Sequence, residues 1–183
     1  MNECAYDLII AGGGLGGCAA AMSACERGMN VLLTEETEWI GGQVTSQGVP
    51  PDEHAWIERF GATRRYRQYR SLVRKTYLET MDIIGEAGEL HNPGKGLVSG
   101  ICHDPRVTLH VLNEMLLPYM LAGHLTIKRN TRVVSVQKEE RMIRKATIQN
   151  TLTDKREDIR ADYFIDATET GELLPLAGLA YAT

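Results

Sequence analysis

A cluster of glycines near the start of the chain constrains the fold more than any other feature. In "YDLIIAGGGLGGCAAAMSACERGMNVLLTEE" (Tyr6 to Glu36), five glycines fall within six residues, between a short aliphatic run and an alanine-rich run. Glycine loses more conformational entropy on folding than any other residue, so such a cluster needs a structural reason. Three explanations are open: a flexible linker, a membrane segment, or a turn whose backbone approaches another group closely.

The flanks of the cluster exclude the first two explanations. Residues Leu8 to Cys25 carry no formal charge, but the aliphatic part is only Leu8-Ile9-Ile10, which is too short to span a membrane. Glu3 and Asp7 precede it, whereas a secretory signal begins with a positively charged region. The strong patterning on both sides is unlike a flexible linker. We therefore expect an ordered turn and no membrane association.

The residues around the cluster predict a strand–helix–strand unit. Tyr6 to Ala11 is short, apolar and followed by glycine, which indicates a buried parallel strand. Gly14 to Arg27 predicts a helix with a small-residue surface, and Gly28 stands where a helix-ending glycine belongs. Met29 to Glu36 predicts a second strand. Such βαβ crossovers are right-handed almost without exception.

The composition fits one globular domain in a reducing compartment. The chain has 183 residues, 43% of them hydrophobic, and a net charge of −4, which does not favour general binding to polyanions. Its four cysteines have no CxxC spacing, so we expect a cytoplasmic protein and neither a disulfide framework nor a zinc site. They are Cys4, Cys18, Cys25 and Cys102. The histidines at 91, 110 and 124 also lack metal-ligand spacing, and we expect no metal.

A helical insertion is predicted after the second strand, over about residues 52–123. Trp39 to Trp56 is rich in glycine and proline and predicts an ordered loop. Arg64 to Leu78 predicts an amphipathic helix. Asp104-Pro105 is typical of a helix start, and Pro118 should kink or restart that helix.

A β-meander is predicted over about residues 125–162. From Leu125 the hydrophobic period changes to two, as in "LTIKRNTRVVSVQ", "RKATIQNTLT" and "IRADYFIDAT". We expect the last of these strands to end as a buried parallel strand. The sequence shows no internal repeat.

The glycine positions match the dinucleotide-binding pattern Gly12-x-Gly14-x-x-Gly17, with an acid at Glu35 about twenty residues further on. Gly12 allows a tight turn out of the strand, Gly14 lets a pyrophosphate reach the backbone, and Gly17 lets the helix pack closely on the sheet. The helix N-terminus presents unpaired N–H groups to the phosphates. Glu35 would accept hydrogen bonds from a ribose diol. We infer that the chain binds FAD or NAD(P).

Two further stretches resemble a known family. The second strand is followed by "WIGGQVTSQG", and the chain ends in "FIDATETGELLPLAG". These motifs resemble FAD-dependent oxidoreductases with the glutathione-reductase-type fold, which are related to the flavoproteins of fumarate reductase and succinate dehydrogenase. The resemblance runs along the whole chain. It implies that residues 1–183 form an α/β, Rossmann-like FAD-binding domain with a parallel sheet, a helical insertion and a β-meander.

The order of the predicted elements also favours FAD. An NAD-binding domain continues as alternating βαβ units. This chain instead continues with a long helical region, a meander and one last parallel strand.

The resemblance implies which residues contact FAD. The glycine doublet Gly41-Gly42 and Gln43 would lie along the diphosphate and ribityl chain. The strand of Val133 would meet the adenine, and the "DAT" segment (Asp166 to Thr168) would return to the cofactor. The full set is Gly12, Gly13, Gly14, Leu15, Gly16, Gly17, Glu35, Glu36, Gly41, Gly42, Gln43, Val133, Ala167 and Thr168. One position departs from the family's usual pattern, because Glu169 stands where a glycine normally follows Ala-Thr.

No residue clearly carries proton transfer. Cys102 and His103 are weak candidates for a redox or acid–base pair, and His54 is a weak candidate for a group near the flavin ring. Ordinary loop positions explain all three equally simply.

Three arginines repeat along the 64–78 helix. Arg67, Arg70 and Arg74 lie about a quarter-turn from a face of tyrosines and valine, and could hold an anionic substrate or RNA. A solvated or interdomain face is the simpler interpretation.

The resemblance implies an enzyme in which the flavin takes a hydride from a small organic substrate at N5. A substrate domain is absent from the sequence, so we expect an FAD-binding portion or a subunit that needs a partner, with no nucleic acid. The alternatives are a non-catalytic cofactor-binding or assembly subunit, and an RNA-modifying flavoprotein that uses the arginines.

Overall fold

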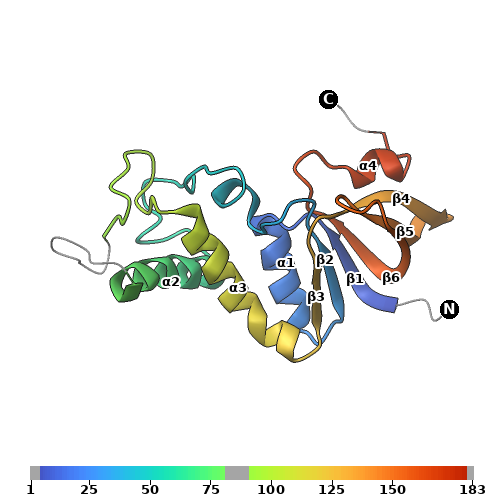
Figure 1. Ribbon diagram of the computed structural model, residues 1–183, viewed down its shortest axis with the longest axis horizontal. Helices are drawn as coiled ribbons and strands as arrows, with labels where there is room; N and C mark the ends of the chain where they lie inside the picture. The colour runs from blue at the N-terminus through green and yellow to red at the C-terminus, as the bar shows by residue number, and fades with distance from the viewer. Residues whose placement is uncertain (1–4, 81–90, 181–183) are drawn as a thin grey trace. The chain divides into compact units, whose positions relative to one another are not determined.

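The chain is a mixed α/β protein with one six-stranded sheet in the computed structural model, which describes residues 5–80 and 91–180 (Figure 1). The strands are β1 (Ala5–Ala11), β2 (Val31–Thr34), β3 (Leu125–Lys128), β4 (Thr131–Glu139), β5 (Met142–Asn150) and β6 (Arg156–Asp166). The helices are α1 (Leu15–Cys25), α2 (Arg64–Thr80), α3 (Pro105–Leu121) and α4 (Leu173–Leu176), with a 3-10 turn η1 (Gly42–Val44). The strand order is β3-β2-β1-β6-β5-β4. Of the four cysteines, Cys4 lies outside the described residues.

Two compact units divide the chain. The first combines Met1–Gly42 with Leu116–Thr183 and holds the sheet, α1 and α4. The second is Gln43–Met115 and holds α2 and most of α3.

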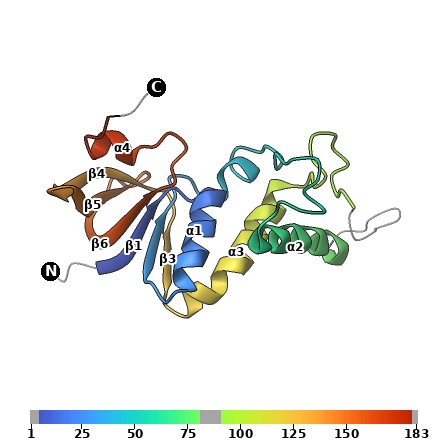
Figure 2. The ribbon, with the colours of Figure 1, turned by 180° about the vertical axis from the view of Figure 1, so that it is seen from behind.

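The predicted βαβ unit is confirmed in the first unit. β1 and β2 pair in parallel, with Leu8 opposite Val31, and α1 packs on both strands (Figure 2). Leu8 to Ala11 and all four residues of β2 are buried, as expected for strands covered on both faces. The buried side of α1 includes Gly17, Cys18 and Ala21, so the helix approaches the sheet closely.

The strands after residue 125 differ from the prediction. Leu125 to Lys128 forms β3, which pairs in parallel with β2 and is not part of the meander. The chain then turns at Asn130, whose φ is +50°, and the meander consists of β4, β5 and β6. A period of two is shared by parallel edge strands and antiparallel strands, so the sequence pattern could not separate them.

Strand β6 joins the two halves of the sheet. Its first residues pair antiparallel with β5, and from Arg160 onward it pairs in parallel with β1. The parallel pairing of this end was correctly predicted. The prediction that it is buried was wrong for two residues, since Tyr163 is 65% exposed and Ile165 is 37% exposed. The core between the two halves is apolar and buried. It includes Ile9, Leu32, Val133, Ile148, Ile159 and Leu173.

Both predicted helices of the insertion are present. α2 buries Tyr69, Val73 and Tyr77, which confirms the apolar face. α3 begins at Pro105 as predicted and continues past Pro118 to Leu121. Pro118 lies in the last turn and cannot donate a hydrogen bond to the carbonyl of Glu114, but the helix does not restart there. No helix among residues 5–80 and 91–180 is long and apolar enough to cross a bilayer.

Candidate dinucleotide site

The turn between β1 and α1 contains two glycines, Gly12 and Gly17, at which a Cβ would clash with backbone atoms. Gly12 has a φ of +97°, and a Cβ at this position would lie 2.3 Å from the carbonyl oxygen of Ala167. A Cβ on Gly17 would lie 2.0 Å from the carbonyl oxygen of Gly12. The turn is therefore pressed against both its own helix and the segment after β6, whose Ala167 N–H donates to Ala11 O at 2.7 Å.

Two other glycines of the turn leave open space. A Cβ on Gly16 would meet nothing within 4 Å, and one on Gly14 would meet only Glu169 Oε1 at 3.7 Å. α1 has no side-chain cap at Gly14 and no acidic residue in its first turn. The first N–H groups of a helix have no partner within the helix, so this end offers donors and a partial positive charge. These features fit the diphosphate of a dinucleotide.

The Glu35 carboxylate is fixed beside the turn. Glu35 follows β2 directly and is buried. Its Oε2 accepts a hydrogen bond from the Gly13 N–H at 3.0 Å, and its Oε1 accepts from the N–H and hydroxyl of Thr37 at 2.9 and 2.7 Å. The contact of Thr37 with Glu35 was not predicted, although a threonine two residues after an acid is a recognisable signal for such a contact.

A buried thiol lies under the same turn. Burial, followed by the charge of Glu35, raises the pKa of Cys18 to about 12, although Arg129 opposes the shift. The Cys18 thiol donates to Gly13 O at 3.3 Å. Cys18 is therefore a neutral structural group.

The glycine doublet meets the turn, although the two are far apart in sequence. Gly41 forms a parallel bridge with Gly14, and its N–H donates to Gly13 O at 2.8 Å. Gly41 and Gly42 both have positive φ, at +111° and +56°. Gln43 belongs to the second unit, where its side-chain amide donates to Pro50 O at 3.4 Å.

The end of β6 is held by Asp166. Its carboxylate accepts hydrogen bonds from the N–H and hydroxyl of Thr168 at 3.1 and 2.6 Å, and from the Leu173 N–H at 2.7 Å. These bonds set the path of Ala167 and Thr168, which the family resemblance placed at the cofactor. This role of Asp166 was not foreseen.

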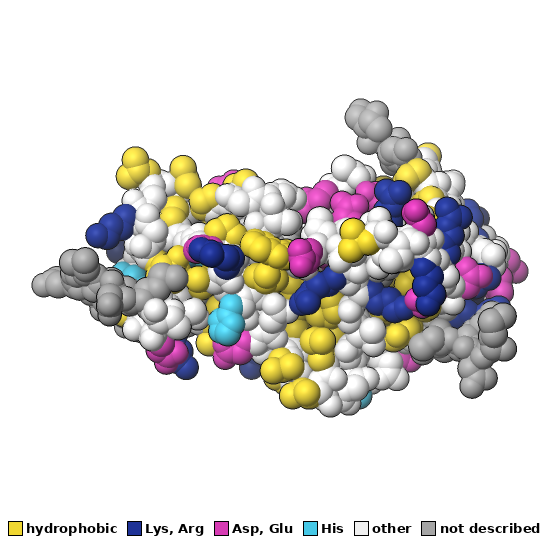
Figure 3. Space-filling model, viewed as in Figure 1, with side chains coloured by type: hydrophobic (Ala, Val, Ile, Leu, Met, Phe, Trp, Pro, Cys, Tyr) yellow, Lys and Arg dark blue, Asp and Glu magenta, His cyan; other side chains and the backbone are white. Residues whose placement is uncertain are grey.

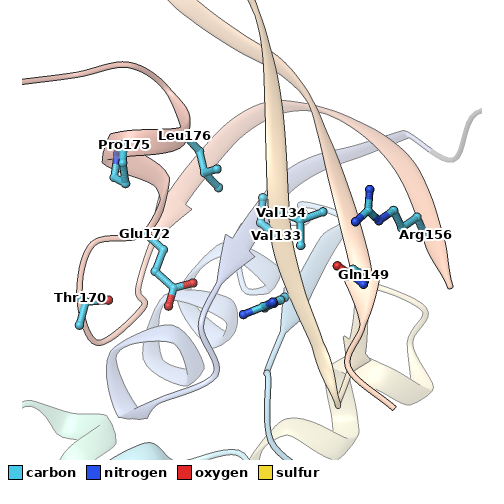
Figure 4. Close-up of a pocket in the computed structure, with 9 residues that line it drawn as sticks. Val133, Val134, Gln149, Arg156, Thr170, Glu172, Pro175 and Leu176 are labelled. Carbon is cyan, nitrogen blue, oxygen red and sulfur yellow. The ribbon is translucent and has the colours of Figure 1, made fainter. Parts of the chain in front are cut away.

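An open pocket of about 590 Å³ lies between the meander and α4 (Figure 4). Its lining residues are Arg132, Val133, Val134, Gln149, Arg156, Thr170, Glu172, Pro175 and Leu176. The Glu172 carboxylate points into it, and burial, together with the charge of Glu36, raises the Glu172 pKa against the effect of Arg132. The Glu172 N–H donates to the Thr168 hydroxyl at 2.8 Å, so the structure brings Val133, which lines the same pocket, and the "DAT" segment into one region.

The three weak catalytic candidates all lie in the second unit, and each has a local partner. His103 Nδ1 contacts Ile101 O, and its Nε2 contacts the hydroxyls of Thr108 and Tyr69. Burial lowers the pKa of His103 and keeps the ring neutral. Both of its nitrogens are used, so the geometry offers no free base.

Cys102 and His54 also have structural contacts. The Cys102 thiol is buried and donates to Ser99 O at 3.4 Å. His54 stacks on Phe60, and its Nδ1 accepts from the Trp56 N–H at 3.2 Å. The structure describes no group of three histidine, cysteine or carboxylate side chains arranged for a metal in residues 5–80 and 91–180.

The interpretation of the α2 arginines as a solvated face was wrong for two of them. Arg70 and Arg74 are buried, with exposed fractions of 3% and 6%, and only Arg67 is exposed. Arg70 is ion-paired with Glu53 and Glu58, and Arg74 shares Glu58. The acids come from the loop before α2, so the sequence of the helix alone could not reveal the pairing.

This pairing withdraws two of the three arginines on which the RNA alternative depended. On the face shown in Figure 3, Lys and Arg side chains are mixed with Asp and Glu. Burial alone would raise the pKa of Glu58, but Arg74 and Arg70 outweigh it and lower the pKa. Arg70 and Arg74 thus neutralise acids in the interior of the second unit.

A family model described as FAD dependent oxidoreductase matches residues 7–183. The chain belongs to the FAD-dependent oxidoreductase family. This match confirms the predicted family and the prediction of FAD as the cofactor.

Individual relatives agree with this family over parts of their length. The 3-oxosteroid 1-dehydrogenase of Comamonas testosteroni is 44% identical over 48 residues, which are 26% of this chain and 8% of the relative. The glycerol-3-phosphate dehydrogenase of Bacillus halodurans, solved with FAD, matches with a TM-score of 0.58 at 17% identity, over 97% of this chain and 37% of its own. A geranylgeranyl bacteriochlorophyll reductase-like protein of Thermoplasma acidophilum matches with a TM-score of 0.57 at 21% identity, over 98% of this chain and 44% of its own. The solved structures share the fold, and this chain spans less than half of each.

Proposed function

We propose that this chain binds FAD along the β1–α1 turn and serves an oxidoreductase that passes a hydride from a small organic substrate to the flavin. One observation carries the proposal: the uncapped N-terminus of α1 faces open space at Gly16, only the Glu169 carboxylate lies in front of Gly14, and the Glu35 carboxylate is fixed beside the turn. A diphosphate needs N–H donors and positive potential, and the turn offers both without a lysine or arginine.

Each part of the site has a proposed partner on FAD. The N–H groups of the first turn of α1, from Leu15 to Gly17, would bind the diphosphate. Glu35 would accept from a ribose hydroxyl with the lone pair on Oε2 that the Gly13 N–H leaves unused. The pocket beside Val133 would receive the adenine. Gly41 and Gly42 would lie along the ribityl chain.

The residues of this chain bind and orient the cofactor. When bound, FAD would supply the hydride acceptor. Neither His103 nor Cys102 is placed for proton transfer among the described residues. We therefore propose that substrate-facing groups come from another part of the protein or from a partner, in keeping with the 37% and 44% of the solved relatives that this chain spans.

The proposal is tested by the visible spectrum and FAD affinity of the purified chain and of Gly14→Val. Gly14 has a φ of −61° and room for a side chain, so the variant should fold while its side chain obstructs the ligand. We expect flavin absorption in the wild type and an affinity at least about tenfold lower in the variant. Ala19→Val, an equally branched change at an exposed position of α1, is the matched control.

A chain that binds NADH and not FAD would refute the cofactor proposal. On the FAD-loaded protein, anaerobic loss of the flavin absorption band on adding a substrate reports hydride transfer. Persistence of the band with every alcohol, amine and steroid tried would count against the proposed reaction once the partner, or the part of the protein that supplies the substrate-facing groups, is present.

A further inference from the structure

Glu169 lies in front of the glycine turn, in the space where a ligand would lie. Its Oε1 would be 3.7 Å from a Cβ on Gly14 and 3.0 Å from a Cβ on Gly42. These are contact distances, so the carboxylate covers both glycines.

The Glu169 side chain is not tied in place within the part of the chain that the structure describes. No hydrogen bond or ion pair to its carboxylate is found there, and the residue is exposed. The neighbouring acids differ: the Glu35 carboxylate is held by Gly13 and Thr37, and that of Asp166 by Thr168 and Leu173. Glu169 can therefore turn away without breaking a polar contact.

The negative charge of Glu169 would affect how the diphosphate of the cofactor binds. The chain has no lysine or arginine before Arg27, so the segment of the turn carries no positive side chain of its own, and Arg129 is the cation that acts on Cys18 beneath it. A carboxylate close to a diphosphate repels it, and the repulsion is weakened by salt.

We propose that Glu169 competes with the FAD diphosphate for the space at Gly14 and Gly42, and has to swing out before the dinucleotide binds. This inference rests on the proposed function, which places the diphosphate at the turn. The carboxylate lowers the affinity for any ligand with a diphosphate in this position. Cofactor binding is then weaker and more easily reversed than it would be with an uncharged side chain at position 169.

The test is calorimetric titration of the full chain and of Glu169→Gln with FAD and with ADP, at low and at high salt. ADP carries the diphosphate but no ribityl chain or flavin. We expect the substitution to tighten both ligands by about fivefold at low salt, with a smaller gain at high salt. Glu140→Gln, which removes one negative charge at the exposed β4–β5 turn, should change neither affinity.

Two other outcomes overturn the inference, and a third applies if the wild type does not bind either ligand. If Glu169→Gln weakens FAD and leaves ADP unchanged, the carboxylate accepts a hydrogen bond from the ribityl chain and does not compete. Unchanged affinities for both ligands would show that the carboxylate has no influence, while the proposed FAD site would stand. If the wild type binds neither ligand, binding by Glu169→Gln would support the inference, and its absence would refute both proposals.

Discussion

Gly16 and Gly17 are adjacent in sequence, yet a methyl group would meet different surroundings at each. At Gly17 it would lie 2.0 Å from the carbonyl oxygen of Gly12, which belongs to the rigid turn. At Gly16 it would meet nothing within 4 Å. We predict that Gly17→Ala lowers the free energy of unfolding by about 3 kcal/mol, because backbone must move to relieve the clash. Urea unfolding measures the change.

Gly16→Ala is the matched control, because the substitution and the helix are the same. Alanine favours a helix over glycine by about 1 kcal/mol, so this variant should be as stable as the wild type or slightly more so. Equal losses in the two variants would contradict the assignment of Gly17 to close helix–strand packing.

The single residues whose role could be predicted from the sequence are those whose role is set by local backbone geometry. Gly12 and Gly17 could be predicted because a tight turn and a close helix leave no room for Cβ atoms. Glu35 could be predicted because its distance from the turn is set by one helix and one strand. Glu169 was noticed only as a departure from a family pattern, since nothing local shows where a loop side chain points.

At the scale of elements, the contact between α2 and α3 predicts that the stability of the protein depends on pH. Tyr69 of α2 and Thr108 of α3 both contact Nε2 of His103. Burial lowers the His103 pKa from 6.5, so the folded protein keeps the ring neutral where the unfolded chain binds a proton. Stability is therefore fully present above about pH 6.5 and falls as the pH drops from there towards the folded-state pKa.

We expect the free energy of unfolding, measured with urea, to fall between about pH 7.5 and about pH 5.5. In His103→Gln it should depend less on pH over this range. Glu58 does not interfere, because its lowered pKa affects stability only below its ordinary value of 4.5. Stability that rises on acidification in the wild type, or a slope unchanged in the variant, would contradict the assigned protonation state.

Elements were predictable where one chain segment carries the whole signal. The extents of β1, α1 and α2 follow from apolar runs and periodicity, and the structure confirms them. The pairing of β3 with β2 was missed because a strand's partner lies far away in sequence. The burial of Arg70 and Arg74 was missed for the same reason, since the neutralising acids come from another segment.

At the scale of the molecule, the proposed FAD contacts gather in the first unit, apart from Gln43. They come from the ends of β1, β2 and β6 and from the edge strand β4. Parallel strands end at one edge of a sheet, so ligands bind there in folds of this class. The family match covers residues 7–183 and thus both units.

The last prediction concerns how FAD stabilises the protein as a whole. A ligand that binds only the folded state stabilises it by mass action, by about 2.7 kcal/mol at a free concentration near 100 times its Kd. We expect FAD to slow amide hydrogen exchange most in Gly13 to Cys18 and in Glu35 to Thr37, which form the proposed diphosphate and ribose contacts. The β4–β5 turn at Glu140 is the internal reference, since it lies at the far end of the same sheet. Gly14→Val should remove the protection at both segments while leaving exchange in the ligand-free chain unchanged. Protection that is as strong at the β4–β5 turn as at the glycine turn would mean that FAD binds elsewhere.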